Sequence, residues 1–286
     1  MRHRNISKIF ELHFNKITWL MNDLGIDPNS FEPNRKFLLG SYFTMEYSIE
    51  SAALFNPSMM EHPDQTELGP GEKRVIISFR GTGEGHISSI VFRCGVLDSQ
   101  NNLNLEPVGT MLAEAERIKR YVYTKEKFVR KLDDLQFFAN KVSPNFVLEK
   151  LGDSFTYGEL KRSIEETKRE NKLSLKRRMI LEQMMWLAQS HYEIDFSLDS
   201  AISERVIFPI ASSEQKGIED ARFVKFTDDD GEVTYYGTYT AYDGRAIMPK
   251  LIETKDFYHF KAIPLHGETA QNKGMALFPR KINGKY

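Results

Sequence analysis

The chain has 286 residues, of which 41% are hydrophobic and 28% charged, as in an ordinary soluble globular protein with a large core. Basic and acidic side chains number 39 and 40, and this near balance gives no sign of a polyanionic partner such as nucleic acid. No apolar run approaches the roughly 18 residues of a membrane span, and neither an apolar stretch nor a cleavage site follows the basic N-terminus. Cys94 is the single cysteine, which excludes an internal disulfide and a cysteine metal site and fits a reducing, cytoplasmic setting.

An amphipathic helix is predicted first, over residues 6–24. Its apolar side chains recur at helical spacing: Ile6, Phe10, Phe14, Ile17, Met21 and Leu24. Gly25 can end the helix in a left-handed cap, and Pro28 lies shortly beyond. We expect the apolar stripe to dock on the rest of the protein, with a subunit interface as the alternative.

Short strands are predicted from about residue 35 to about residue 107, where the hydrophobic pattern changes and loops rich in Gly, Pro and Asp recur. The strand segments are 36–39, 51–55, 74–79 and 87–92. Their succession favours an antiparallel meander.

A helical insertion is predicted over residues 110–202. Helix-forming residues dominate the segments 111–123, 125–140, 157–171 and 173–192. Met179, Met184, Met185 and Trp186 indicate a packed core at this spacing, with a ligand pocket as the alternative. Two roles stay open for the insertion: covering an active-site mouth, or mediating dimerisation.

Strands are predicted again from about residue 205 onwards. Their segments are 206–208, 222–226, 234–241 and 275–278. Residues 228–231, Asp-Asp-Asp-Gly, indicate a tight turn, because their spacing does not match a calcium loop. Asn283-Gly284 is a hairpin signal that no strand follows, so we expect the chain to be a piece of a longer protein.

Two adjacent carboxylates, Glu219 and Asp220, stand at the start of a predicted strand and shortly before Arg222. On a regular strand they point to opposite faces, so they cannot do the same job. One can face a cleft while Arg222 or the backbone holds the other, and such a division of roles suits acid–base catalysis. A solvated turn is the alternative.

A glycine-rich segment, residues 80–86, lets the backbone approach a ligand closely and presents Arg80, Glu84 and His86. It lacks the lysine, the Ser/Thr and the following helix of a phosphate loop, and it is not a dinucleotide loop either. A flexible hairpin without a ligand is the alternative.

Asn56 and Lys273 each carry a side chain suited to a sugar or phosphate site. Asn56 precedes Pro57, which favours an extended backbone, and its amide can bind a hydroxyl; a plain turn is the alternative. Lys273 stands beside Gly274 and can place an ammonium at the floor of a site, or it lies on the surface.

Together these segments resemble glycoside hydrolase family 130, the mannoside phosphorylases and β-mannosidases. The matching segments are 50–57, 80–89, 214–222, 236–242 and 272–286. They include the pattern Gly-x-Glu-Asp-Pro-Arg preceded by Glu, with Ala221 in place of the proline, and Leu-Phe-Pro followed by a basic residue and Ile-Asn-Gly-Lys-Tyr. The first helix and the helical block look like additions found in a longer branch of that family.

The resemblance implies a mainly β fold, a five-bladed β-propeller with its active site at the central axis, of which about three blades are present. The implied organisation has four parts: an N-terminal helical extension (1–34), a first propeller portion (35–109), the helical insertion (110–202) and a second, truncated propeller portion (203–286).

The resemblance also implies cleavage of β-mannosides with inversion. Asp220 is the implied acid, acting through the 3-hydroxyl of the mannosyl residue, and inorganic phosphate attacks from the opposite face; in hydrolytic members water replaces phosphate and a further carboxylate is the base. The substrate-binding residues expected are Asn56, Arg80, Glu219, Tyr239 and Tyr242. The phosphate-binding residues expected are Arg80, His86, Arg245 and Lys273.

The resemblance also implies a set of binding partners. The substrate expected is a manno-oligosaccharide, with phosphate as a co-substrate of the phosphorolytic reaction, no metal, no other cofactor, and a homo-oligomer formed through the helical parts. A furanosidase-like five-bladed propeller is one alternative, although it needs an aspartate base that residues 36–49 do not contain. A non-catalytic carbohydrate-binding or scaffold propeller is the other.

Overall fold

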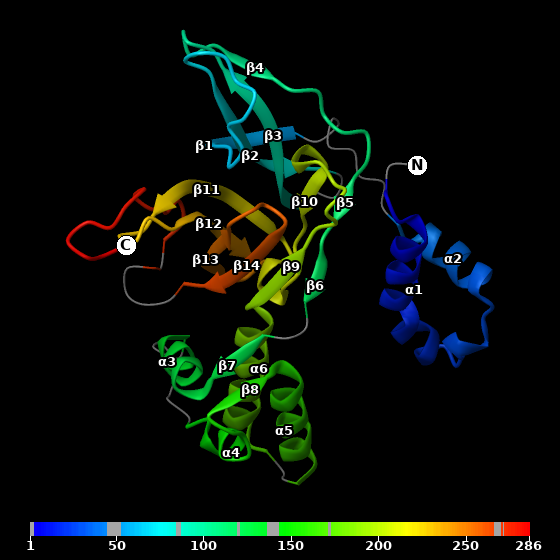
Figure 1. The fold of residues 1–286 in the computed structure, drawn as a ribbon. Helices are drawn as coiled ribbons and strands as arrows, with labels where there is room; N and C mark the ends of the chain where they lie inside the picture. Colours follow the sequence, from blue (N-terminus) through cyan, green and yellow to red (C-terminus); the bar gives the residue numbers. More distant parts are fainter. Residues whose placement is uncertain are drawn as a thin grey trace.

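The fold is mainly β, with two large sheets and two helical parts (Figure 1). The computed structural model describes residues 3–44, 53–83, 87–118, 121–135, 143–170, 173–265, 270 and 272–286. Each large sheet has six strands, and the described strands of neither sheet close into a barrel. No helix in these described ranges is both long and apolar enough to cross a membrane.

The first sheet is built on an antiparallel meander of three strands. Its strands are β1 (Ala53–Glu61), β2 (Lys73–Thr82), β3 (Ser88–Leu97), β10 (Arg205–Ile207), β5 (Ala113–Glu114) and, beside β3, β4 (Leu103–Leu105). The strands predicted at 74–79 and 87–92 are confirmed as β2 and β3. Of the strand predicted at 51–55, residues 51 and 52 lie outside the described residues, and the rest belongs to β1. β10 returns from far along the chain to pair with β3, and it lies parallel to β5.

The second sheet is antiparallel throughout. Its strands, in spatial order, are β11 (Gly217–Thr227), β12 (Val233–Tyr242), β13 (Ile247–Thr254), β14 (His259–Pro264), β9 (Tyr192–Asp195) and β6 (Glu116–Ile118). The tight turn predicted at 228–231 is confirmed: Gly231 has a φ of 84° and its N–H donates to the carbonyl of Asp228 at 2.9 Å.

One hydrophobic core joins the two sheets. Phe92 of β3 is fully buried at its centre, and its ring packs edge-on against Phe223 and Phe257 and stacks on Phe260. Because the last three rings come from the second sheet or its turns, this core fixes β11 against β3.

A separate core lies in a helical unit below the sheets in Figure 1. Its elements are β7 (Val122–Thr124), α3 (Lys125–Leu135), α4 (Asn145–Leu148), β8 (Ser154–Thr156), α5 (Tyr157–Glu170) and α6 (Leu175–Gln189). Leu132, Val147, Leu160 and Met184 are fully buried there. Met184 therefore belongs to a packed core, the first of the two interpretations that the methionine cluster allowed.

Two antiparallel helices stand to the side of the sheets, α1 (Ile6–Asp23) and α2 (Pro33–Tyr42), with a 3-10 turn at Pro28–Ser30 between them (Figure 1). The predicted helix end is confirmed: Gly25 has a φ of 73°, Gly25 N–H donates to the Asn22 carbonyl and Ile26 N–H to the Met21 carbonyl. These two bonds define a Schellman cap. Gly40 allows close packing, since a Cβ there would lie 1.9 Å from the Phe10 carbonyl oxygen.

Three secondary-structure predictions are wrong. Residues 36–39 lie in α2, because Pro33 opens that helix and a short apolar run does not distinguish helix from strand. The described residues of 111–123, which are 111–118 and 121–123, form β5, β6 and the start of β7 instead of a helix, because β10, β9 and β8 pair with them. Residues 275–278 form no strand, and the Met275 carbonyl accepts a hydrogen bond from the Thr238 hydroxyl.

These differences cross two of the expected boundaries. The helix α2 extends past residue 35, and β5, β6 and β9, which lie within 110–202, are strands of the two large sheets. The division into four parts stays a prediction. The Asn283-Gly284 turn forms as expected, with φ of 52° and 72° and reciprocal bonds between Ile282 and Lys285.

Candidate active site

A β-bulge on β11 presents the two adjacent carboxylates. The pairing of β11 with β12 runs from Glu219 opposite Thr240 directly to Arg222 opposite Thr238, so two residues face one across the break. Asp220 lies in this bulge with a φ of 56°. A non-glycine residue rarely adopts a positive φ, and bulges re-aim side chains next to active sites. The local backbone thus sets the direction of the Asp220 side chain.

A second bulge, on β1, faces the first. The pairing of β1 with β2 breaks between Phe55 and Ser58, and Asn56 has a φ of 50°. The Asn56 side-chain amide donates to Oδ1 of Asp220. The Ser58 hydroxyl accepts the backbone N–H of Phe223 at 2.9 Å, which ties the two strands together beside the bulges. The two bulges therefore bring the side-chain amide of Asn56 and the carboxylate of Asp220 into contact.

Two cations hold the neighbouring carboxylate. Arg80 Nη2 donates to Glu219 Oε1 at 3.2 Å, and Lys273 Nζ donates to Glu219 Oε2 at 2.7 Å. Arg80 Nη1 also lies 3.6 Å from Asp220 Oδ1. The side chains of Glu219, Asp220 and Lys273 are 14%, 29% and 48% exposed, so the group is open to solvent on one side. We call Asn56, Arg80, Glu219, Asp220 and Lys273 the Asp220 cluster.

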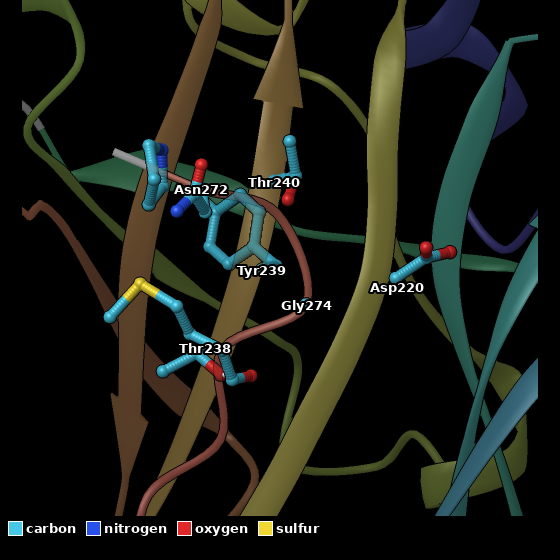
Figure 2. A pocket seen from close by; sticks show the side chains of 8 residues that line it. Asp220, Thr238, Tyr239, Thr240, Asn272 and Gly274 are labelled. Atoms are coloured by element: carbon cyan, nitrogen blue, oxygen red, sulfur yellow. The ribbon is translucent and has the colours of Figure 1, made fainter. Parts of the chain in front are cut away.

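A small pocket adjoins the backbone of the Asp220 bulge. Its lining residues are Asp220, Thr238, Tyr239, Thr240, Pro249, Asn272, Gly274 and Met275. Figure 2 shows the carboxyl group of Asp220 on the far side of its strand from Tyr239 and Asn272, pointing toward the first sheet. The carboxylate therefore faces Asn56 and Arg80. Asp220 borders the pocket through its strand and not through its carboxyl group.

A second carboxylate cluster lies wholly inside the protein. Lys250 Nζ donates to Glu214 Oε1 at 2.6 Å, and both side chains are 0% exposed. The hydroxyl groups of Tyr239 and Tyr192 also donate to Oε1, at 2.8 and 3.0 Å. The backbone N–H groups of residues 210 and 211 donate to Oε2 at 2.9 and 3.0 Å. We call Glu214, Lys250, Tyr192 and Tyr239 the Glu214 cluster.

The burial of this cluster shifts the pKa of each member. Burial alone would raise the pKa of Glu214, but Lys250 and the backbone donors hold it below its ordinary value. Burial lowers the pKa of Lys250, and Glu214 offsets part of that effect. Burial and the negative charge of Glu214 raise the pKa values of Tyr192 and Tyr239. Every member has a hydrogen-bond partner, as a buried polar group requires.

The structure brings together most of the residues expected at the site. The residues of the Asp220 cluster meet, and Tyr242 lies beside them with its ring 5.7 Å from Lys273 Nζ. Tyr239 lines the pocket, but its hydroxyl is buried against Glu214. Arg245 is exposed in the turn between β12 and β13, and His86 lies outside the described residues.

Two details of the acid pair are corrected. Glu219 and Asp220 do not point to opposite faces, since both approach the guanidinium of Arg80; the bulge interrupts the alternation of a regular strand. Arg222 does not hold either acid in this structure; it donates to the Pro57 carbonyl at 3.4 Å, and Arg80 and Lys273 hold Glu219 instead.

The buried pair of Glu214 and Lys250 is a feature that sequence reasoning missed. A signal existed for Lys250, since it interrupts the apolar run of residues 247–252 in a strand. A lysine inside such a run needs a buried acid. Among the described residues, no group of three or more His, Cys, Asp or Glu side chains could hold a metal ion.

The chain has weak sequence similarity to a mannoside phosphorylase. No family model matches it. Over 102 residues it is 31% identical to a β-1,2-mannobiose phosphorylase of Listeria innocua serovar 6a, a match that covers 35% of this chain and 26% of that protein. The match thus spans about a quarter of the length of the curated relative.

A solved structure gives a weaker comparison. The structure of β-1,2-mannobiose phosphorylase from Listeria innocua in complex with β-1,2-mannobiose has a TM-score of 0.31 and 17% identity, with 84% of this chain and 52% of that chain covered.

Proposed function

We propose that the protein cleaves β-mannosides with Asp220 as the proton donor. The observation that carries this proposal is the facing pair of bulges, which holds a partly exposed carboxylate against the amide of Asn56 and near the guanidinium of Arg80. The sequence similarity to a β-1,2-mannobiose phosphorylase supports the same substrate class, a manno-oligosaccharide. The two six-stranded sheets are proposed to belong to a propeller whose axis passes near Asp220.

The contact with Asn56 orients the carboxyl group of Asp220 for the proposed role. Asn56 donates to one carboxyl oxygen of Asp220, so this oxygen is oriented and the other is left for a sugar hydroxyl. A proton from Asp220 would reach the leaving oxygen through the 3-hydroxyl of the mannosyl residue. The nucleophile, phosphate or water, would attack from the opposite face, as inversion requires. Arg80 and Tyr242 are proposed to contact the sugar.

The test is the substitution Asp220→Asn in the complete natural polypeptide. Release of mannose or mannose 1-phosphate from β-1,2-mannobiose is measured with and without phosphate. We expect kcat to fall by roughly 10²–10⁴, the usual contribution of a positioned acid, while Asp220→Asn keeps the shape of the side chain. Asp229→Asn is the matched control, because its carboxylate is 83% exposed in the β11–β12 turn.

Two results would contradict the proposal. A loss in kcat of less than about tenfold for Asp220→Asn would remove Asp220 from the role of proton donor. Binding of β-1,2-mannobiose by calorimetry, with no turnover by the unsubstituted protein in either assay, would favour a carbohydrate-binding protein instead.

A further inference from the structure

Glu219 has one cation on each carboxylate oxygen. Oε1 accepts from Arg80 and Oε2 from Lys273, which come from β2 and from the segment after β14. Arg80 and Lys273, the two members of the Asp220 cluster expected to bind phosphate, therefore donate to the same carboxylate. This bridging arrangement is the one that a phosphate oxyanion would adopt between an arginine and a lysine.

The charges of the cluster also balance without a ligand. Arg80 and Lys273 supply two positive charges, and Glu219 and Asp220 supply two negative charges within 4 Å of them. A phosphate dianion that approached this pair of cations would meet both carboxylates and would have to displace one. Glu219 is the less exposed of the two acids, at 14% against 29%, so its contact with the cations is the better shielded from water.

We infer that Glu219 acts as an internal anion that occupies the place between Arg80 and Lys273 and keeps inorganic phosphate from binding there. This inference rests on the proposed function and adds to it a statement about ligand class. At this pair of cations the protein accepts neutral sugar hydroxyls rather than phosphate. A hydroxyl can donate to Glu219 without breaking either ion pair, whereas a phosphate group competes with Glu219 for the same donors.

The position of Lys273 supports this role. Lys273 lies just before Gly274, which has a φ of 76°, in a segment without regular secondary structure. Its ammonium is held by Glu219 at 2.7 Å and lies near the ring of Tyr242. Glu219 therefore also anchors the segment that carries Lys273 beside the pocket. The same contact between Glu219 and Lys273 fills the anion position and holds this segment in place.

The test is calorimetric titration of inorganic phosphate into the complete natural polypeptide and its Glu219→Gln variant. Removal of one negative charge leaves both cations in place, so we expect the dissociation constant for phosphate to fall by roughly tenfold or more. Glu61→Gln is the matched control. It removes the same charge from a separate ion pair, that of Glu61 on β1 with Lys225 on β11, and should leave phosphate binding unchanged.

A double variant, Glu219→Gln with Lys273→Met, should lose the gain. Equal or weaker phosphate binding by Glu219→Gln would overturn the inference, and so would an equal gain in Glu61→Gln. The titration requires no turnover. A gain in binding without any cleavage of mannosides would therefore support the role of Glu219 and contradict only the proposed function, and cleavage without the gain would do the reverse.

Discussion

Glu214 and Glu219 stand a few residues apart in the sequence, yet they define two opposite kinds of ionic cluster. The Glu214 cluster is closed: its acid and lysine are 0% exposed, and backbone and tyrosine donors fill the remaining positions. The Asp220 cluster is open on one side and stands on two bulges with positive φ. Complete burial with complete hydrogen bonding stabilises a fold, whereas a part-exposed cluster on irregular backbone retains capacity for a ligand.

The two clusters are neighbours across β12. Glu214 caps its own turn just before β11 and binds β12 through Tyr239 and β13 through Lys250. Across β12, the break in pairing at the Asp220 bulge falls between Thr240 and Thr238, the two neighbours of Tyr239. The closed cluster therefore lies directly beside the strand segment that faces the bulge.

Removal of one partner from the closed cluster should have the largest effect. Lys250→Met leaves Glu214 as a buried charge without its cation, and we expect the free energy of unfolding to fall by about 3–5 kcal/mol. Chemical denaturation measures this change. Lys273→Met in the open cluster is the control and should cost about 1 kcal/mol or less, because its ammonium is half exposed. Equal losses in the two variants would erase the distinction between the clusters.

Acid should destabilise the fold through His191. His191, which precedes Tyr192 and stacks on Tyr121, is buried, and burial with nearby Lys131, Lys261 and Lys250 lowers its pKa from 6.5 to about 2. The unfolded chain binds the proton more readily, so stability is present above pH 6.5 and declines as the pH falls toward 2. The expected slope is about 1.4 kcal/mol per pH unit within that window.

Denaturation of the protein and of His191→Gln between about pH 7 and about pH 4 checks this slope. The variant should lose the contribution of His191, so its unfolding free energy should change less steeply with pH. An identical pH dependence in the two proteins would show that His191 takes up its proton without unfolding.

The smallest expected effect separates two tyrosines of β12. Tyr239→Phe removes a hydroxyl that donates to Glu214, and we expect a loss of about 1–2 kcal/mol in the free energy of unfolding. Tyr235→Phe is the matched control on the same strand, since its buried hydroxyl has no hydrogen-bond partner among the described residues. It should leave stability unchanged or slightly raised. A loss as large for Tyr235→Phe as for Tyr239→Phe would contradict the assigned role of the Tyr239 hydroxyl.

Much of the local structure could be predicted from the sequence. The helix α1 and its cap at Gly25, the turn at 228–231, the Asn283-Gly284 turn and the strands of the β1–β3 meander follow from short-range patterns. Such patterns depend on the φ preferences of single residues and on side-chain periodicity within one element. They fail at 36–39, where a short apolar run does not distinguish a helix from a strand, and at 111–123, where pairing with distant strands decides the outcome.

The sequence by itself determined which residue types the site would contain, since the motifs around Asn56, Arg80, Asp220 and Lys273 suggested them before any contact was known. Only the tertiary structure decided how they meet. The two bulges depend on the register between strands, which no local pattern records, and they turn both acids toward Arg80. The ion pair of Glu214 with Lys250 likewise depends on long-range packing. A buried lysine needs an acidic partner, and only the fold decides which acid lies close enough.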